Sequence, residues 1–180
     1  MAEGGLSLGA GDAVSLAIRN TGSVQASGGS VTVAAQRGEV RNTGSIDVSV
    51  ASGKAGSIAV SGERVSNAGS ITADAGEGAA GSVTFTSATQ TRMESGAEIS
   101  AAGGAGHADG GTVLIHSYAG DTRLDAGSRV DISGGGLGGD GAVPIAAARR
   151  VWGLGCDGGE CAFERHGAAR RRPDRDRRVD

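Results

Sequence analysis

The sequence predicts an all-β fold: a single-stranded parallel β-helix (β-solenoid) of about five coils, with three short strands per coil and a disordered C-terminal tail. Three observations support this prediction. A five-residue phrase recurs along the chain. Apolar and polar residues alternate around it, which is the two-residue period of a strand. The repeats differ in length only in glycine-rich loops. Because each interior Gly destabilises a helix by about 1 kcal/mol, 35 Gly in 180 residues argue against a helical repeat.

The chain divides into three parts. Residues 1–12 are a Gly-rich lead-in, residues 13–145 are the repeat domain, and residues 146–180 are an Arg-rich tail. We expect the solenoid to stop at Val143-Pro144-Ile145, because Pro144 removes a ladder donor and no sixth copy of the pattern follows. The tail is expected to be disordered or to result from a frameshift near Gly141, which would make the chain the product of a truncated gene.

The recurring phrase ends each time in an aliphatic residue. Its three clear copies are Asn20-Thr21-Gly22-Ser23-Val24, Asn42-Thr43-Gly44-Ser45-Ile46 and Asn67-Ala68-Gly69-Ser70-Ile71, and degenerate copies end at Ile99 and Val130. Stacked amides hydrogen-bond from coil to coil, and Gly permits tight turns. The phrase therefore predicts a structural ladder at a corner, without a catalytic role, made by Asn20, Asn42, Asn67, Gly22, Gly44 and Gly69.

Three sets of inward-facing residues are predicted to stack through the coils. The first set lies six residues before the phrase-final aliphatic, the second lies two residues after it, and the third is a later pair. In chain order the sets are Ile18, Val40, Val65, Met93 and Leu124; Ala26, Val48, Ala73, Ala101 and Ile132; and Val31/Val33, Ile58/Val60, Val83/Phe85, Val113/Ile115 and Val143/Ile145.

Coils that read Val-x-Asn-x-Gly-Ser-Ile-x-Ala resemble those of filamentous haemagglutinin-type exoproteins, the large adhesins of two-partner secretion systems. The resemblance includes the strands Gly81-Ser82-Val83-Thr84-Phe85 and Gly111-Thr112-Val113-Leu114-Ile115, and it covers about residues 13–145. It implies a surface-exposed or released bacterial adhesin that passes through an outer-membrane transporter barrel and contacts host or neighbouring cells.

The resemblance also implies that this chain is an internal piece of a longer protein. The secretion domain of that family, with its signal peptide, has no counterpart in the sequence. The localisation expected from the family is extracellular, whereas the piece as written would stay in the cytoplasm. No stretch approaches the roughly 20 apolar residues of a membrane span, and no cofactor or metal is expected.

One strip of charge accompanies the first set of inward residues. Each coil places one Arg beside it, and we expect these five side chains to lie on one outer face. The strip is either a solvated, mutually compensating charge ladder or a site for anionic glycans, because guanidinium groups suit sulfate and carboxylate. Its residues are Arg19, Arg41, Arg64, Arg92 and Arg123.

Other functions are less well supported by the residues. Glu94 and Asp125 are expected in adjacent coils, a spacing that suits a carbohydrate-active enzyme, but neighbouring Arg would keep both ionised and remove the proton donor. Gly135–Ala142 matches one copy of the calcium-type nonapeptide up to a small final residue, and such sites need consecutive copies. Cys156 and Cys161 lack zinc or redox spacing. Acidic residues interleave the basic tail, so no nucleic-acid partner is expected.

Overall fold

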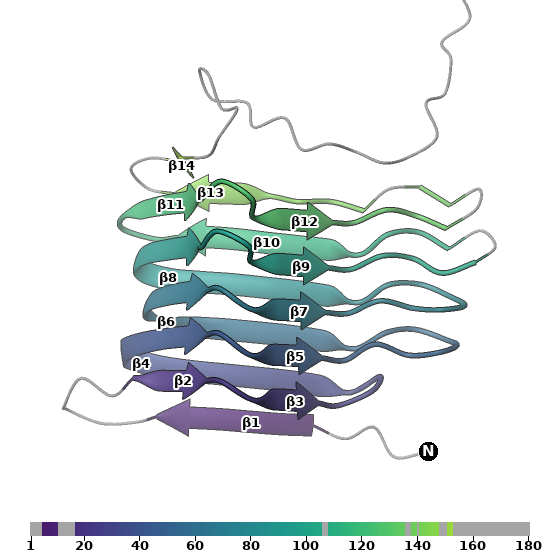
Figure 1. Ribbon diagram of the computed structural model, residues 1–180, viewed down its shortest axis with the longest axis horizontal. Helices are drawn as coiled ribbons and strands as arrows, with labels where there is room; N and C mark the ends of the chain where they lie inside the picture. The colour runs from purple at the N-terminus through teal and green to yellow at the C-terminus, as the bar shows by residue number, and fades with distance from the viewer. Residues whose placement is uncertain are drawn as a thin grey trace, which may run out of the picture.

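The computed structural model of the protein describes residues 5–10, 17–105, 108–135, 138–139, 141–147 and 151–152. Over these residues the chain winds into a β-solenoid of about five coils, in which each strand pairs in parallel with a strand of the next coil (Figure 1). The same residues contain no helix, and hence none long and apolar enough to cross a membrane. The predicted fold class is confirmed.

The coils build two parallel sheets. The first, which we call the main sheet, has the order β1-β4-β6-β8-β10-β13, with β2, β11 and β14 attached to it, and the second, the short-strand sheet, has the order β3-β5-β7-β9-β12. The main-sheet strands are β1 Gly5–Ala10, β2 Ile18–Asn20, β4 Ser30–Asn42, β6 Ser57–Asn67, β8 Ser82–Met93, β10 Thr112–Ser117, β11 Asp121–Leu124, β13 Ile145–Ala147 and β14 Val151–Trp152. The short strands are β3 Ser23–Gln25, β5 Ser45–Asp47, β7 Ser70–Thr72, β9 Glu98–Ser100 and β12 Arg129–Asp131.

The expected three strands per coil are partly merged. In β4, β6 and β8, the later apolar pair of one coil and the first strand of the next lie on one continuous strand. The pairing shifts register between Ala35 and Glu39 and between Gly62 and Arg64, where an irregularity bends the strand without ending it. In the outer coils the two halves are separate strands: β1 and β2, β10 and β11, and β13 and β14.

The strand register stacks two columns of apolar residues, the phrase-final residues and the later apolar pair, and thereby confirms the third predicted set. The phrase-final aliphatics Val24, Ile46, Ile71, Ile99 and Val130 pair in sequence through the short-strand sheet. Val33, Val60, Phe85, Ile115 and Ile145 pair in the same way through the main sheet. Phe85 is the largest fully buried side chain. These columns form one continuous core cluster.

The column that begins with Ile18 was predicted wrongly in its last two members. Val65 pairs with Thr91, and Thr91 with Thr122, whereas Met93 pairs with Asn67 and Leu124 with Met93. The corner from Met93 to Ile99 is two residues longer than the corner from Asn67 to Ile71. The additional residues make a turn in which Ala97 N donates to Glu94 O (3.0 Å) and Gly96 has a φ of 78°.

The solenoid also extends beyond the predicted bounds of 13 and 145. β1 precedes residue 13 and pairs with β4 from Gly5↔Ser30 to Ala10↔Ala35. At the other end β14 pairs with β11. Pro144 does not stop the stacking, because its carbonyl accepts a hydrogen bond from Ile115 N (3.0 Å). Most of the predicted tail, residues 148–150 and 153–180, lies outside the described residues.

Candidate functional site

The asparagines of the recurring phrase form a ladder inside one corner of the solenoid. Each is the last residue of its strand. Asn20 Nδ2 donates to Asn42 Oδ1 (2.8 Å), and Asn42 Nδ2 donates to Asn67 Oδ1 (2.7 Å). Asn42 and Asn67 are almost fully buried. Amides that hydrogen-bond one another in this way can line the interior without unpaired polar atoms. The ladder ends at Asn67, because the next residue in the column is Met93, which has no amide.

The glycines of the phrase are required by close approach of the coils. A Cβ on Gly44 would lie 2.0 Å from Gly22 O, and one on Gly69 would lie 2.0 Å from Gly44 O. Neither Gly has the positive φ that the expected turn role requires. The stacking distance between coils, more than local turn geometry, therefore explains why Gly recurs at this position.

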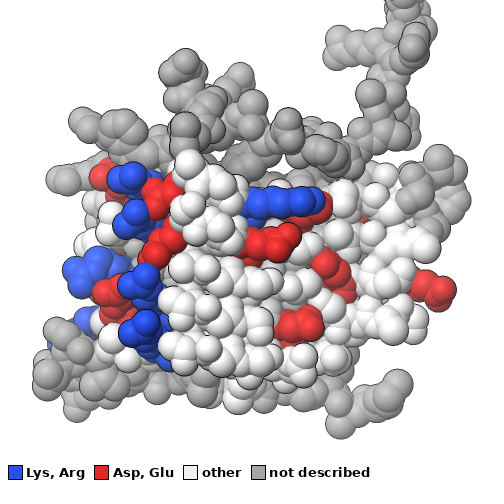
Figure 2. Space-filling model, viewed as in Figure 1, with Lys and Arg blue, Asp and Glu red and all other residues white. Residues whose placement is uncertain are grey.

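Charged side chains gather along the edge where the long strands bend (Figure 2). Arg19 pairs in register with Arg41, and Arg123 with Arg92. Ser66 occupies the place between Arg41 and Arg92. The fifth predicted member, Arg64, lies in the adjacent column, because it pairs with Glu39. The predicted strip is thus one column of four Arg, interrupted by a small residue, with a fifth Arg beside it.

Acidic groups compensate most of this strip. Arg41 bonds Glu94 (2.9 Å) and Arg64 lies 3.8 Å from Glu39. Arg92 Nε donates to Asp125 Oδ2 (2.7 Å), and Arg123 bonds the other carboxylate oxygen of Asp125. Among the described residues Arg19 makes no ion pair. The geometry at this edge is that of a charge ladder in which the carboxylates of Glu39, Glu94 and Asp125 compensate four of the five guanidinium groups.

The electrostatics of Asp125 follow from these contacts. Partial burial of its carboxyl group raises its pKa, but hydrogen bonds from Arg92 and Arg123, together with their charges, outweigh desolvation and leave the pKa below its usual value. Asp125 is therefore held ionised. Glu94, the other carboxylate considered for an enzymatic pair, is bonded to Arg41.

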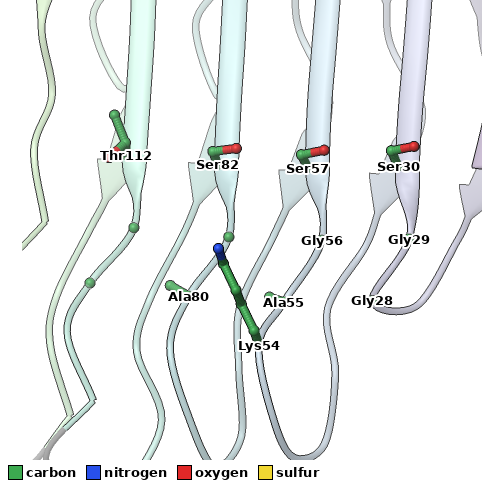
Figure 3. A pocket seen from close by; sticks show the side chains of 13 residues that line it. Gly28, Gly29, Ser30, Lys54, Ala55, Gly56, Ser57, Ala80, Ser82 and Thr112 are labelled. Atoms are coloured by element: carbon green, nitrogen blue, oxygen red, sulfur yellow. The ribbon is translucent and has the colours of Figure 1, made fainter. Parts of the chain in front are cut away.

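A second surface feature lies where the loops re-enter the main sheet. It is an open groove of about 610 Å³ that crosses four coils. We call it the glycine–serine groove; its floor and walls are formed by Gly28, Gly29, Ser30, Lys54, Ala55, Gly56, Ser57, Ala80, Gly81, Ser82, Gly110, Gly111 and Thr112. Figure 3 shows Ser30, Ser57, Ser82 and Thr112 at equivalent places on adjacent strands, and Lys54 pointing from its own loop toward the coil that carries Ser82.

The floor of the groove is a column of glycines with fully used backbone groups. Gly56 N donates to Val48 O (3.1 Å) within its coil, and Ser82 N donates to Gly56 O (3.1 Å) from the next coil. The neighbouring coils repeat this pattern. A Cβ on Gly81 would lie 1.9 Å from Gly56 O. The column must therefore be Gly, and its side-chain-free surface forms the hollow.

The sequence prediction missed this groove, although a signal for it was present. A Gly followed by Ser or Thr and an aliphatic residue precedes each later apolar pair, at Gly29-Ser30-Val31, Gly56-Ser57-Ile58, Gly81-Ser82-Val83 and Gly111-Thr112-Val113. Ala142 replaces the hydroxyl residue in the fifth coil, and the groove ends at Thr112. The pattern was used only to recognise the strands.

The remaining sequence candidates are not brought together. Cys156, Cys161 and Asp140, the acidic residue of the calcium-type stretch, lie outside the described residues. Within the part of the chain that the structure describes, no three His, Cys, Asp or Glu side chains gather in a way that would hold a metal ion.

No family model, no curated protein and no solved structure matches this chain.

Proposed function

We propose that this chain is a structural and adhesive segment of a surface-exposed bacterial exoprotein, of the kind that filamentous haemagglutinins represent. The observation that carries the proposal is that the buried side chains repeat from coil to coil, whereas the surface loops vary. The columns of Val, Ile and Phe repeat with the coils, while the loops differ in length and composition. A solenoid of this type grows by adding coils, each of which contacts only its neighbours, and so extends a variable surface over a long distance.

In the longer protein, an outer-membrane transporter barrel would export the chain, and ligands on host or neighbouring cells would contact its outer face. The coil motif from Val65 to Ala73, read together with the Gly81–Phe85 strand, supports the haemagglutinin type specifically. The Arg strip is less well supported as a site for anionic glycans, because Glu39, Glu94 and Asp125 already form ion pairs with its Arg residues.

A carbohydrate-active enzyme is the alternative function for this fold. The contacts at the charged edge disfavour it, since a glycosidase pair needs one protonated carboxyl group. Asp125 lies between two guanidinium groups that lower its pKa, and Glu94 bonds Arg41. Asp125 is therefore held ionised and is not placed to act as the proton donor.

The experiment is saturation binding of the fluorescently labelled full chain to epithelial cells and to bacterial cells. We expect saturable binding that excess unlabelled chain competes away. Absence of saturable binding to either cell type would contradict the adhesive proposal. Release of new reducing ends when the chain is incubated with polysaccharides would favour the enzyme instead.

A further inference from the structure

We propose that the glycine–serine groove binds a linear, hydroxyl-rich glycan that carries carboxylate groups, with the glycan chain running along the solenoid axis and Lys54 contacting a carboxylate. The proposal names a ligand class for the adhesive surface and in that respect rests on the proposed function. The groove is separate from the Arg strip: its lining residues include none of the five Arg of that strip.

The first argument is the direction of the groove. It passes over one equivalent segment from each of four coils, so its long dimension follows the stacking of the coils. Adjacent strands lie about 4.8 Å apart, and Ser30, Ser57, Ser82 and Thr112 occupy paired positions. A ligand that contacts all four must be an extended polymer.

The second argument is the chemistry of the lining. The four hydroxyl groups make no hydrogen bond within the part of the protein that the structure describes, in contrast to Thr91, which bonds Ser87 Oγ (2.8 Å) and His116 O (3.1 Å). Each hydroxyl can both donate and accept. A row of uncommitted donors and acceptors suits the hydroxyl groups of a glycan.

The third argument excludes an extended peptide that adds a strand. Strand addition requires free backbone N–H and C=O groups at a sheet edge. The floor glycines offer none, because Gly81 N bonds Ala73 O (2.8 Å) and Gly81 O accepts from Thr112 N (3.2 Å). Side-chain hydroxyls are what remains available to a ligand in this groove.

The fourth argument concerns Lys54, the only lysine in the chain. Its side chain is exposed and points across the groove (Figure 3). It makes no ion pair among the described residues. An ammonium group next to a row of hydroxyls gives the site a preference for a glycan with a carboxylate over a neutral one.

The single lysine makes a direct footprint possible. The full chain is acetylated with an amine-reactive ester in the presence of an oligogalacturonate, a neutral malto-oligosaccharide or poly-glutamate, and modification of Lys54 is measured by peptide mass spectrometry. We expect protection by the oligogalacturonate and none by the other two. If the oligogalacturonate leaves Lys54 unprotected, or if poly-glutamate protects it equally, the proposal is wrong.

Variants provide an independent measurement by titration calorimetry with the same oligogalacturonate. Lys54→Gln is expected to weaken binding about three- to tenfold, as loss of one charge-assisted contact does, and Lys54→Arg to retain it. Ser57→Leu and Ser82→Leu fill the groove and are expected to abolish binding. Ser23→Leu, at an exposed position of the short-strand sheet, is the matched control and should bind as the parent does. Circular dichroism verifies that each variant folds.

Equal affinity of Ser57→Leu and Ser23→Leu would overturn the groove as the binding site. Comparison of glycan binding with cell binding separates the groove proposal from the adhesive function. Glycan binding without any binding to cells contradicts adhesion alone, and cell binding that Lys54→Gln and Ser57→Leu leave unchanged contradicts the groove alone.

Discussion

Arg41 bonds Glu94 (2.9 Å) although the two residues lie two coils apart. The coil between them places Ser66 in register with Arg41 on one side and with Arg92 on the other. The guanidinium group of Arg41 thus bonds a carboxylate on the second coil along, and the small residue Ser66 occupies the coil between them. Three successive coils are thereby linked at their outer edge.

This ion pair should contribute a small, salt-dependent stabilisation. Both partners remain partly exposed, with side-chain exposures of 42% for Arg41 and 22% for Glu94, so we expect Glu94→Gln to lower the free energy of unfolding by about 0.2–1 kcal/mol. Urea unfolding at low and high salt measures it. Glu98→Gln is the control, because Glu98 is exposed and makes no ion pair among the described residues. Equal effects of the two substitutions would contradict the prediction.

The asparagine ladder should be most sensitive at its middle member. Asn42→Ala removes the acceptor for Asn20 Nδ2 and the donor to Asn67 Oδ1. We expect a loss of about 1–3 kcal/mol, because buried polar groups lose their partners. Asn20→Ala, which removes one of these bonds at a less buried position, should cause a clearly smaller loss. Denaturant unfolding of both variants tests this order, and the reverse order would exclude a ladder that stabilises through its buried bonds.

Close approach of the coils predicts opposite outcomes at two equivalent glycines. Gly44→Ala places a methyl group 2.0 Å from Gly22 O, whereas a Cβ on Gly22 has no atom within 4 Å. We expect Gly44→Ala to destabilise the protein by at least about 2 kcal/mol and Gly22→Ala to change its stability by less than about 0.5 kcal/mol. Thermal and urea unfolding compare the two. Tolerance of Ala at position 44 would mean that the coils lie further apart than described.

Acid should weaken the contacts of Asp125 in a defined pH range. Its pKa in the folded protein is below the usual Asp value of about 4. The resulting stabilisation is present above that usual value and is lost as the pH falls through the lower folded pKa. We therefore expect Asp125→Asn to be less stable than the parent at neutral pH.

The difference between Asp125→Asn and the parent should shrink as the pH falls below the usual Asp value, and it should disappear once the pH is below the lowered folded pKa of Asp125, where the parent carboxyl group is itself protonated. Urea unfolding across this range gives the measurement. Glu98→Gln again serves as the control and should track the parent at each pH. A difference that stays constant down to the lowest pH would show that Asp125 acts through packing and not through its charge.

The sequence was sufficient to predict the fold class and the columns that contain Ile71 and Phe85, because strict alternation identifies inward residues. It was not sufficient for the corner at Glu94. A shift of two residues leaves each side chain on the same face, so Met93 seemed to belong with Val65 as well as with Asn67. Only the backbone pairing distinguishes these alternatives.

The same limit affected the surface. The Arg strip was predicted from sequence spacing, but its ion-pair partners depend on register, and Arg41 bonds Glu94 two coils away, across the coil that carries Ser66. The groove was missed because the pattern that contains Gly81 was used only to recognise strands, whereas the close approach of Gly81 to Gly56 O arises from stacking. Contacts between coils carry information that a single repeat does not contain.

The corner that lengthens by two residues between Met93 and Ile99 has a consequence for the gene. An insertion of six nucleotides at this place adds one outward and one inward position, and it leaves the flanking strands with their original faces. An insertion of three nucleotides reverses the faces unless the turn absorbs it. Corners of this solenoid can therefore diversify in steps of two codons while the interior pattern is inherited unchanged.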